Sequence, residues 1–309
     1  MAVLGHQLQT YATTAGARED VLDLITQVDP EETPLLSRLG VSKAAGRYHE
    51  WLNDTLESGT GSGGADLEGA AAAGRRLSAR SRSGNICQIS SYTFGISGTQ
   101  EAIAQYGLDS EYSYQLEKAM KILKIMQEQI LLNSTYAFDV PASYQCATAA
   151  RTLRGLFAAI TTNVQTGSAG SCALTESAFN TLLQTIFENG SGKQPDVAFV
   201  NGFQKRRISG FSSNNVRYIN MQAEKTLRNT IVAYESDFGT ISVVLDRWVP
   251  KGDFPVLSMD DFKIAYLRKP FVQQLGVAGD AKEAQIITEY TLEHLNESNS
   301  GKATGFATA

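Results

Sequence analysis

The spacing of apolar residues predicts a long helix between Asp109 and Asn133. Its apolar residues recur three or four positions apart, on one face: Tyr112, Leu116, Met120, Leu123, Met126 and Ile130. Asp109 or Ser110 is suited to cap its start, and about 23 residues make a rod of roughly 34 Å. Glu117–Lys121 and Lys124–Glu128 are predicted ion pairs on the opposite, polar face. The stripe is more typical of a core than of a cofactor site.

Helix and strand patterns alternate after residue 150. A helix is predicted over Thr175–Glu188, ended by Asn189-Gly190, and its apolar residues are Phe179, Leu182, Leu183, Ile186 and Phe187. Further predicted elements are a buried strand at 195–201, a helix at 204–211, a hairpin of 231–234 and 240–248, and strands at 256–259, 262–268 and 283–295. The last strand has Ala284, Ile286, Thr288, Tyr290 and Leu292 on one face. The polar, small-residue tail 296–309 is predicted to be disordered.

The first half of the chain carries two segments without an evident core. Residues 1 to about 45 form an arm with one short helix, Ala17–Val28, which Asp29-Pro30 ends. Gly59–Gly74 contains six glycines and five alanines between predicted strands at 47–52 and 86–96. Such a run buries little apolar area and costs much backbone entropy to order. We therefore expect a β-ribbon with a mobile tip, suited to contact another copy of the protein.

Composition narrows the function classes. The 309 residues are 42% hydrophobic with a formal net charge of −5, which argues against a dedicated nucleic-acid binder. No apolar run approaches the roughly 18 residues of a membrane span, and Met1–Thr10 lacks a signal-peptide pattern. Three widely spaced cysteines, Cys87, Cys146 and Cys172, are expected to be free, buried thiols in a reducing compartment.

Catalytic motifs are weak throughout. The three histidines, His6, His49 and His294, have no metal-site spacing, so we expect no metal, cofactor or catalytic residue. The formal G-x-G-x-x-G match at 59–64 lacks the buried strand before it and the acid after it that a dinucleotide site needs. Asp237-Phe238-Gly239 is explained by a turn between strands, and the adjacent carboxylates at 31–32 and 260–261 by turn and cap roles.

Four arginines follow the glycine-rich tip within eight residues: Arg75, Arg76, Arg80 and Arg82. The simplest interpretation is a solvated positive face on a strand. An intersubunit ion-pair zone is the functional alternative, because the chain is acidic overall, and a phosphate contact comes third. Tyr48, His49 and Trp51, at the base of the ribbon, are further candidates for intersubunit contact, although His49 also suits a packed or hydrogen-bonded role.

The order of these parts resembles the major capsid proteins of tailed bacteriophages, which have the Johnson fold (Hong Kong 97-type), an α+β fold. Local stretches carry the resemblance: Arg18–Asp23, Pro30–Leu35, Tyr48–Trp51, Tyr234–Gly239, Gly279-Asp280 and the strand Glu289–Glu293. The resemblance implies an N-terminal arm (1–46), an extended β-loop (47–96, tip 59–74), a peripheral domain (97–149, spine helix 109–133), an axial domain (about 150–255), return strands completing the peripheral domain (256–295) and a flexible tail (296–309).

The resemblance also implies a role and partners. Pentamers and hexamers of the chain would close into an icosahedral shell around double-stranded DNA, with the protein made in the host bacterial cytoplasm and located in the virion. Scaffold, portal and cement proteins are further implied partners, and a membrane is not. No lysine lies between Lys43 and Lys118, so the lysine crosslink of some members is not expected. The arm is short for a built-in scaffold, so a separate or already removed scaffold is expected.

Two alternatives remain open at this point. An encapsulin-type nanocompartment shell shares the fold but encloses a cargo enzyme. A cytosolic α/β enzyme with an unrecognised site would instead show a deep pocket with perturbed ionisable groups.

Overall fold

The computed structural model of the protein describes residues 29–56, 68–69, 79–103, 107–134, 150–167, 172–211, 233–276 and 279–308. Several predictions concern residues outside these ranges: the arm helix at 17–28, all of the glycine-rich tip except 68–69, Arg75, Arg76 and Cys146.

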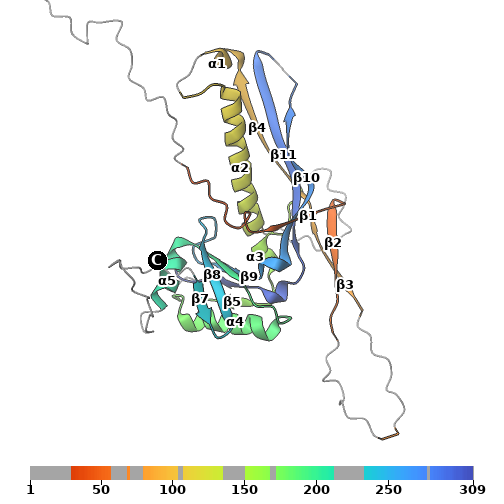
Figure 1. Ribbon diagram of the computed structural model, residues 1–309, viewed down its shortest axis with the longest axis vertical. Helices are drawn as coiled ribbons and strands as arrows, with labels where there is room; N and C mark the ends of the chain where they lie inside the picture. Colours follow the sequence, from red (N-terminus) through yellow and green to blue (C-terminus); the bar gives the residue numbers. More distant parts are fainter. Residues whose placement is uncertain are drawn as a thin grey trace, which may run out of the picture.

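Helices and strands alternate along the described chain (Figure 1). The helices are α1 (Gly98–Ala102), α2 (Glu111–Asn133), α3 (Leu156–Ala159), α4 (Glu176–Asn189) and α5 (Gly202–Phe211), with single 3₁₀ turns η4 (Met259–Asp261) and η5 (Glu297–Asn299). The strands are β1 (Gly40–Lys43), β2 (Tyr48–Asn53), β3 (Ser81–Ile86), β4 (Gln88–Ser97), β5 (Val164–Thr166), β6 (Val197–Val200), β7 (Ala233–Ser236), β8 (Gly239–Leu245), β9 (Phe254–Leu257), β10 (Phe262–Gln274), β11 (Ala281–His294) and β12 (Gly301–Thr304).

One half of the molecule, here named the long-helix unit, is a four-stranded sheet with α2 lying along it (Figure 1). Its strand order is β1-β10-β11-β4, in which β1 is parallel to β10 and the other pairs are antiparallel. The Ser110 side chain accepts from Ser113 N and caps α2, which confirms the predicted helix and selects between the two predicted caps. Ala119 and Leu123 of α2 pack against Ile286 of β11.

The predicted apolar stripe of α2 is wrong in part. Met120 is 43% exposed, whereas Ala119, one position earlier, is buried where β4 and β11 approach the helix. The predicted Glu117–Lys121 pair forms, with 3.2 Å between Nζ and Oε1. The predicted Lys124–Glu128 surface pair does not, because Glu128 is fully buried.

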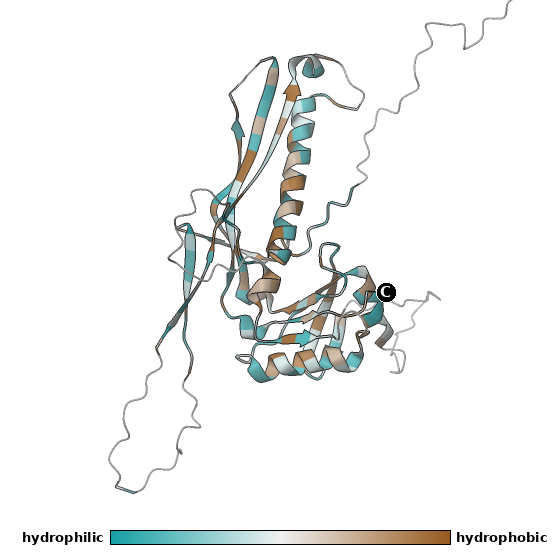
Figure 2. Cartoon of the chain, turned by 180° about the vertical axis from the view of Figure 1, so that it is seen from behind, coloured by the Kyte–Doolittle hydropathy of each residue, from teal (hydrophilic) through white to brown (hydrophobic). Residues whose placement is uncertain are grey.

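The other half, here named the six-stranded unit, holds most of the core. Its sheet has the order β5-β12-β9-β6-β8-β7, with α4 packed on β12 and β5 and α5 on β6 and β8. Apolar residues concentrate in this unit and at the end of α2 that reaches it (Figure 2), where Leu131 and Leu132 enter the main core. The predicted hairpin around 236–239 is confirmed as β7–β8, and Gly239 there has φ +123°. Phe187, predicted for the buried face of α4, is 59% exposed.

The C-terminal residues correct a second prediction: those described are ordered parts of the fold. β12 lies inside the six-stranded sheet, parallel to β5 and antiparallel to β9. Phe306 is 2% exposed, and the Gln204 side chain donates to Ala307 O at 3.1 Å. A Cβ on Gly301 would lie 2.8 Å from Ile186 Cδ1. The small residues that resembled a flexible tail are required because β12 runs close beneath α4. Because β9 also joins this sheet, the predicted boundary at residue 255 cuts through a strand.

The predicted strand at 86–96 corresponds to β4, apart from Ile86, which is the last residue of β3 before Cys87. β3 pairs only with β2 in a separate two-stranded ribbon, whereas β4 joins the four-stranded sheet. Cys87 is fully buried and its N–H donates to Arg47 O at 2.8 Å, which closes the base of the ribbon. The ribbon therefore spans a shorter part of the chain than the predicted loop 47–96.

The second part of the predicted arm belongs to the subunit's own core. Leu35 and Leu39 are buried in the main core, and β1 forms four parallel pairs with β10, from Gly40↔Lys263 to Lys43↔Tyr266. The expectation that the whole arm lacks a core of its own is wrong for these residues.

Candidate functional site

The β2–β3 ribbon leaves the body between the two units and points away from both (Figure 1). Its six residue pairs run antiparallel from Tyr48↔Ile86 at the base to Asn53↔Ser81. Neither strand has a further neighbour in a sheet among the described residues. The ribbon strands are largely hydrophilic (Figure 2). A two-stranded ribbon of this kind is marginal on its own, so the base must supply its stability.

Asn85 fixes the base of the ribbon to β11 and to the segment before α3. Its Nδ2 donates to Leu292 O of β11 at 2.9 Å and to Arg154 O at 3.0 Å. Its Oδ1 accepts from Arg154 N and Ile86 N, both at 2.9 Å. Both donors and both acceptor lone pairs are used, and the residue is 3% exposed. This side chain therefore determines where the ribbon begins and in which direction it leaves.

An aromatic cluster supports the opposite strand. Trp51 is 8% exposed and meets His294 edge-on, with ring centroids 4.8 Å apart, and His49 at 6.0 Å. His49 Nε2 lies 3.3 Å from Glu293 Oε2, which also accepts from Ser42 Oγ. The structure thus places Trp51 and most of His49 inside the subunit, in the packed role that the sequence suggested for His49. Tyr48 is half-buried, and a Cβ on Gly84 would lie 2.7 Å from its Cε1.

Arg80 and Arg82 lie farther out on the ribbon and are exposed. Arg80 Nε is 3.4 Å from Asp54 Oδ2, with 71% of the arginine side chain exposed. Arg82 Nη1 is 3.5 Å from Glu50 Oε2, with 66% exposed. Exposed pairs at these distances contribute little to stability. Most of each guanidinium stays open to a further partner.

Two buried ionisable groups at the base, His294 and Cys87, have shifted pKa values. Burial lowers the pKa of His294 to about 4, so its ring is neutral at pH 7. Burial raises the pKa of the Cys87 thiol to about 11, which keeps it protonated. Cys172 is exposed, which corrects the prediction that the thiols are buried. Among the described residues, no group of three or more His, Cys, Asp or Glu side chains is arranged to hold a metal ion. No described helix is long and apolar enough to cross a membrane.

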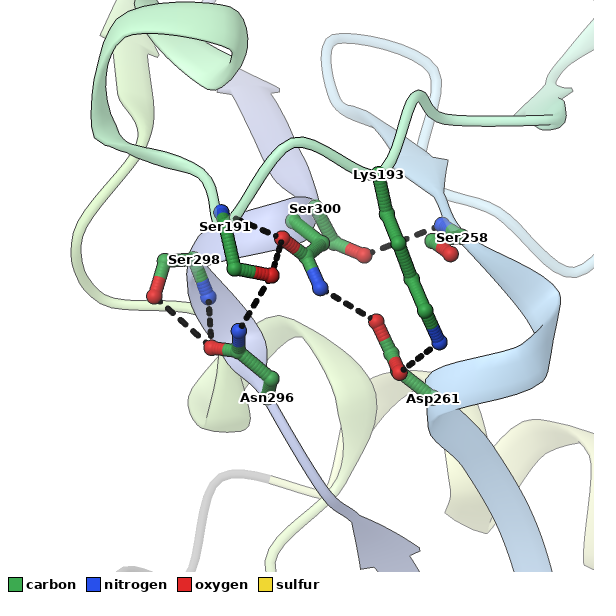
Figure 3. Close-up of polar contacts among 8 residues, drawn as sticks. Ser191, Lys193, Ser258, Asp261, Asn296, Ser298 and Ser300 are labelled. Carbon is green, nitrogen blue, oxygen red and sulfur yellow. Dashed lines mark hydrogen bonds and ion pairs between the residues drawn. The ribbon is translucent and has the colours of Figure 1, made fainter. Parts of the chain in front are cut away.

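A polar network lies where the chain passes between the four-stranded and the six-stranded sheets (Figure 3). Asp261, 4% exposed, accepts from Lys193 Nζ at 3.0 Å and from Asn299 Nδ2 at 2.6 Å. Asn299 Oδ1 in turn accepts from Ser191 N and Oγ, both at 2.9 Å. The chain crosses between the sheets twice here, at 258–261 and 295–300, and Leu295 N donates to Asp261 O at 2.8 Å.

This network was missed in the sequence, where Asp260-Asp261 suggests a turn and 296–300 a tail. The run Asn296–Ser300 is dense in side chains that cap and turn. Asn296 accepts from Ser298 N at 3.1 Å, and the Ser300 hydroxyl accepts from Ser258 N at 3.0 Å (Figure 3). That density of capping residues was the available signal.

The model of the SU10 major capsid protein family matches residues 7–307. The chain belongs to this family of major capsid proteins. The match runs through both units, the ribbon and the C-terminal strand, so it describes the complete arrangement and not one motif.

Individual relatives agree with this capsid assignment. The major capsid protein of Escherichia phage Phieco32 is 31% identical over 127 residues, which cover 41% of this chain and 36% of that protein. The chain therefore matches about a third of the length of that relative. The capsid asymmetric unit of cyanophage A-1(L) has the same fold at a TM-score of 0.72 and 14% identity, over 97% of this chain and all of that one.

The fold by itself does not separate a phage capsid protein from an encapsulin. The SrpI encapsulin of Synechococcus elongatus PCC 7942 aligns over 98% of this chain and 97% of its own at a TM-score of 0.58 and 11% identity. At such identities the likeness shows the fold alone. The sequence family is what assigns this chain to the major capsid proteins, and the α+β Johnson fold is confirmed.

Proposed function

We propose that the chain is the subunit of an icosahedral shell, in which its pentamers and hexamers enclose the double-stranded DNA of a tailed phage. The family match carries the proposal. The ribbon supports it, because a two-stranded element outside both units leaves area to be buried on neighbouring copies. The binding free energies of many such contacts between copies add up over a closed lattice. The net charge of −5 suits a wall that contains DNA without binding it tightly.

The parts of the subunit follow from this proposal. The ribbon and its tip act as the extended loop, the long-helix unit as the peripheral domain with α2 as spine, and the six-stranded unit as the axial domain. The ordered residues 296–308 then belong to the axial domain through β12. The subunit acts structurally and not as an enzyme, which agrees with the neutral His294 and the protonated Cys87.

Arg80 and Arg82, together with Arg75 and Arg76, are proposed to form ion pairs with acidic side chains of a neighbouring copy. The exposure of Arg80 and Arg82 supports this role. Scaffold, portal and cement proteins are proposed as further partners. The protein is made in the host cytoplasm and ends in the virion.

The proposal is tested by expressing the full chain, with and without the scaffold protein encoded by its phage. Size exclusion with light scattering and electron microscopy would then measure the products. We expect megadalton shells, tubes or capsomer rings. A chain that stays monomeric under both conditions contradicts the proposal, and shells that contain a host enzyme in place of DNA in infected cells favour the encapsulin alternative.

The arginines are tested by comparing two double variants. R80S/R82S should reduce shell yield while the melting temperature of the subunit stays within about 2 °C. E50Q/D54N removes the partners of both arginines within the ribbon and should leave shell yield unchanged. Equal loss of assembly in both variants would show that the pairs within the ribbon matter, and normal assembly of R80S/R82S would show a solvated face.

A further inference from the structure

One buried glutamate helps to hold the arm against the body, beside the buried Leu35 and Leu39 and the pairing of β1 with β10. Residues 33–39 form a helical turn in which Leu39 N donates to Leu35 O at 3.0 Å. The first N–H groups of this turn have no partner within it, and Glu128 of α2 takes two of them. Leu35 N donates to Glu128 Oε1 at 2.8 Å and Leu36 N to Oε2 at 2.7 Å. A carboxylate at the start of a turn is a favourable cap.

A second buried carboxyl group lies against this cap. Asp246, directly after β8, shares a side-chain hydrogen bond with Glu128, and both residues are 0% exposed. Asp246 Oδ1 accepts from Trp248 N at 2.9 Å. Asp246 Oδ2 is buried and no donor of the described residues reaches it. A proton held between the two carboxyl groups supplies the missing donor, since two carboxylates in contact cannot both ionise without a large cost.

The surrounding charges do not neutralise the pair. On α2, Lys121 is engaged with Glu31 of the arm and Glu117 of its own helix. Lys124 of α2, Glu32 and Arg38 of the arm, and Arg247 after β8 are exposed, and no ion pair between described residues includes Glu128 or Asp246. Burial is therefore the main influence on both carboxyl groups, and the charge of Asp246 also acts on Glu128.

We propose that Glu128 and Asp246 form a proton-held latch that fastens the arm turn 33–39 to α2 and to the end of β8, and that loss of the shared proton releases the turn. The three parts belong to the arm, the long-helix unit and the six-stranded unit. The latch therefore links the position of the arm to the protonation of one buried pair. It acts within a single subunit and does not depend on assembly.

The direction of the pH effect follows from burial. Burial raises the pKa of Glu128 to about 7 and also raises the pKa of Asp246. A carboxyl group whose folded pKa is raised stabilises the closed state below its ordinary pKa and loses that contribution as the pH rises through the folded value. The latch is therefore closed most firmly below the ordinary carboxyl pKa, and its opening equilibrium increases by roughly tenfold per pH unit as the pH rises towards about 7, above which it levels off.

Hydrogen exchange of the full chain measures this opening directly. Peptides covering 29–39 are followed by mass spectrometry between pH 5.5 and 9, with each rate corrected for the intrinsic pH dependence of exchange. In the wild type the corrected opening should increase by roughly tenfold between pH 5.5 and 7 and should level off at higher pH. Peptides of α4 should stay protected throughout, which separates local release from global unfolding.

Two variants replace the titrating proton by a fixed group. In D246N the amide Nδ2 donates permanently to Glu128, so the turn should stay closed over the whole range. In E128Q one of the two backbone N–H groups loses its acceptor, so the turn should be more open than in the wild type at pH 6 and equally open at pH 9. E31Q removes only the exposed pair with Lys121 and should keep the wild-type pH dependence.

Three results would overturn the latch. The first is wild-type opening that does not change between pH 5.5 and 7. The second is a pH transition that persists in both D246N and E128Q. The third is loss of α4 protection in step with the turn.

Discussion

Asn85 and Arg154 exchange two hydrogen bonds, side chain to backbone, across the base of the ribbon. Asn85 Nδ2 donates to Arg154 O at 3.0 Å, and Arg154 N donates to Asn85 Oδ1 at 2.9 Å. The asparagine amide thus acts as an added peptide group, and it ties the ribbon to the segment that leads into the six-stranded unit.

Asn85→Ala should therefore lower the free energy of unfolding by about 2–4 kcal/mol, because it removes the hydrogen bonds of the buried amide to Leu292 O and Arg154 N. Asn53→Ala, at the other end of the same ribbon, should change it by less than about 0.5 kcal/mol. Urea unfolding of both variants checks this. Similar stability of the two would mean that water replaces the amide.

Gly301→Val should lower the unfolding free energy by about 1–3 kcal/mol, because the added Cβ lies 2.8 Å from Ile186 Cδ1 and 2.9 Å from Leu182 Cδ1. A Cβ on Gly276 would meet no atom within 4 Å beyond its chain neighbours, so Gly276→Val is a matched control with little expected effect. Thermal melting of both variants checks this. A lower melting temperature for Gly301→Val alone indicates an ordered β12, and equal melting temperatures indicate the disordered tail that the sequence suggested.

Asp261→Asn should destabilise the connection between the two units by about 1–3 kcal/mol, since the buried carboxylate accepts from Lys193 and Asn299. Asp260→Asn changes an exposed neighbour and should have almost no effect. Hydrogen exchange of the peptides that cover 295–304, compared between the two variants, measures this effect. Equal protection in both variants would show that Asp261 does not fasten this segment.

His294 predicts a loss of stability in acid. Its pKa is lowered to about 4 by burial, so between the ordinary value of 6.5 and about 4 the unfolded state binds the proton and the folded state does not. Folding stability should therefore fall as the pH drops through this window, by up to roughly 3 kcal/mol. His294→Gln removes this titration. The stability difference between wild type and variant should shrink from pH 7.5 to 4.5, and a constant difference would contradict the lowered pKa.

Elements with a strong local pattern were predicted correctly. α2, α4 and the β7–β8 hairpin show their apolar period, caps and turn residues within one short stretch of sequence. The alternating face of β11 was also correct, since Ala284, Ile286 and Tyr290 are all fully buried. The family resemblance then followed from the order of these parts.

Positions whose environment comes from distant segments were not predictable in this way. Met120 has the apolar character of a core residue but faces solvent, because the approach of β4 and β11 selects Ala119 for the contact. The sequence predicted β4 but only the last residue of β3, because the partner of β3 is the distant strand β2 of the ribbon, whereas β4 joins the four-stranded sheet.

The sequence alone determined the kinds of element, their order, and the family to which the arrangement belongs, because apolar period and turn chemistry are local properties. Only the tertiary structure decided which polar residues are buried. Glu128 pairs with the backbone of Leu35 and Leu36 and with Asp246, and Asp261 with Lys193 and Asn299. A buried polar group is tolerated only where a distant segment supplies its partner, and that partner exists only once the chain has folded.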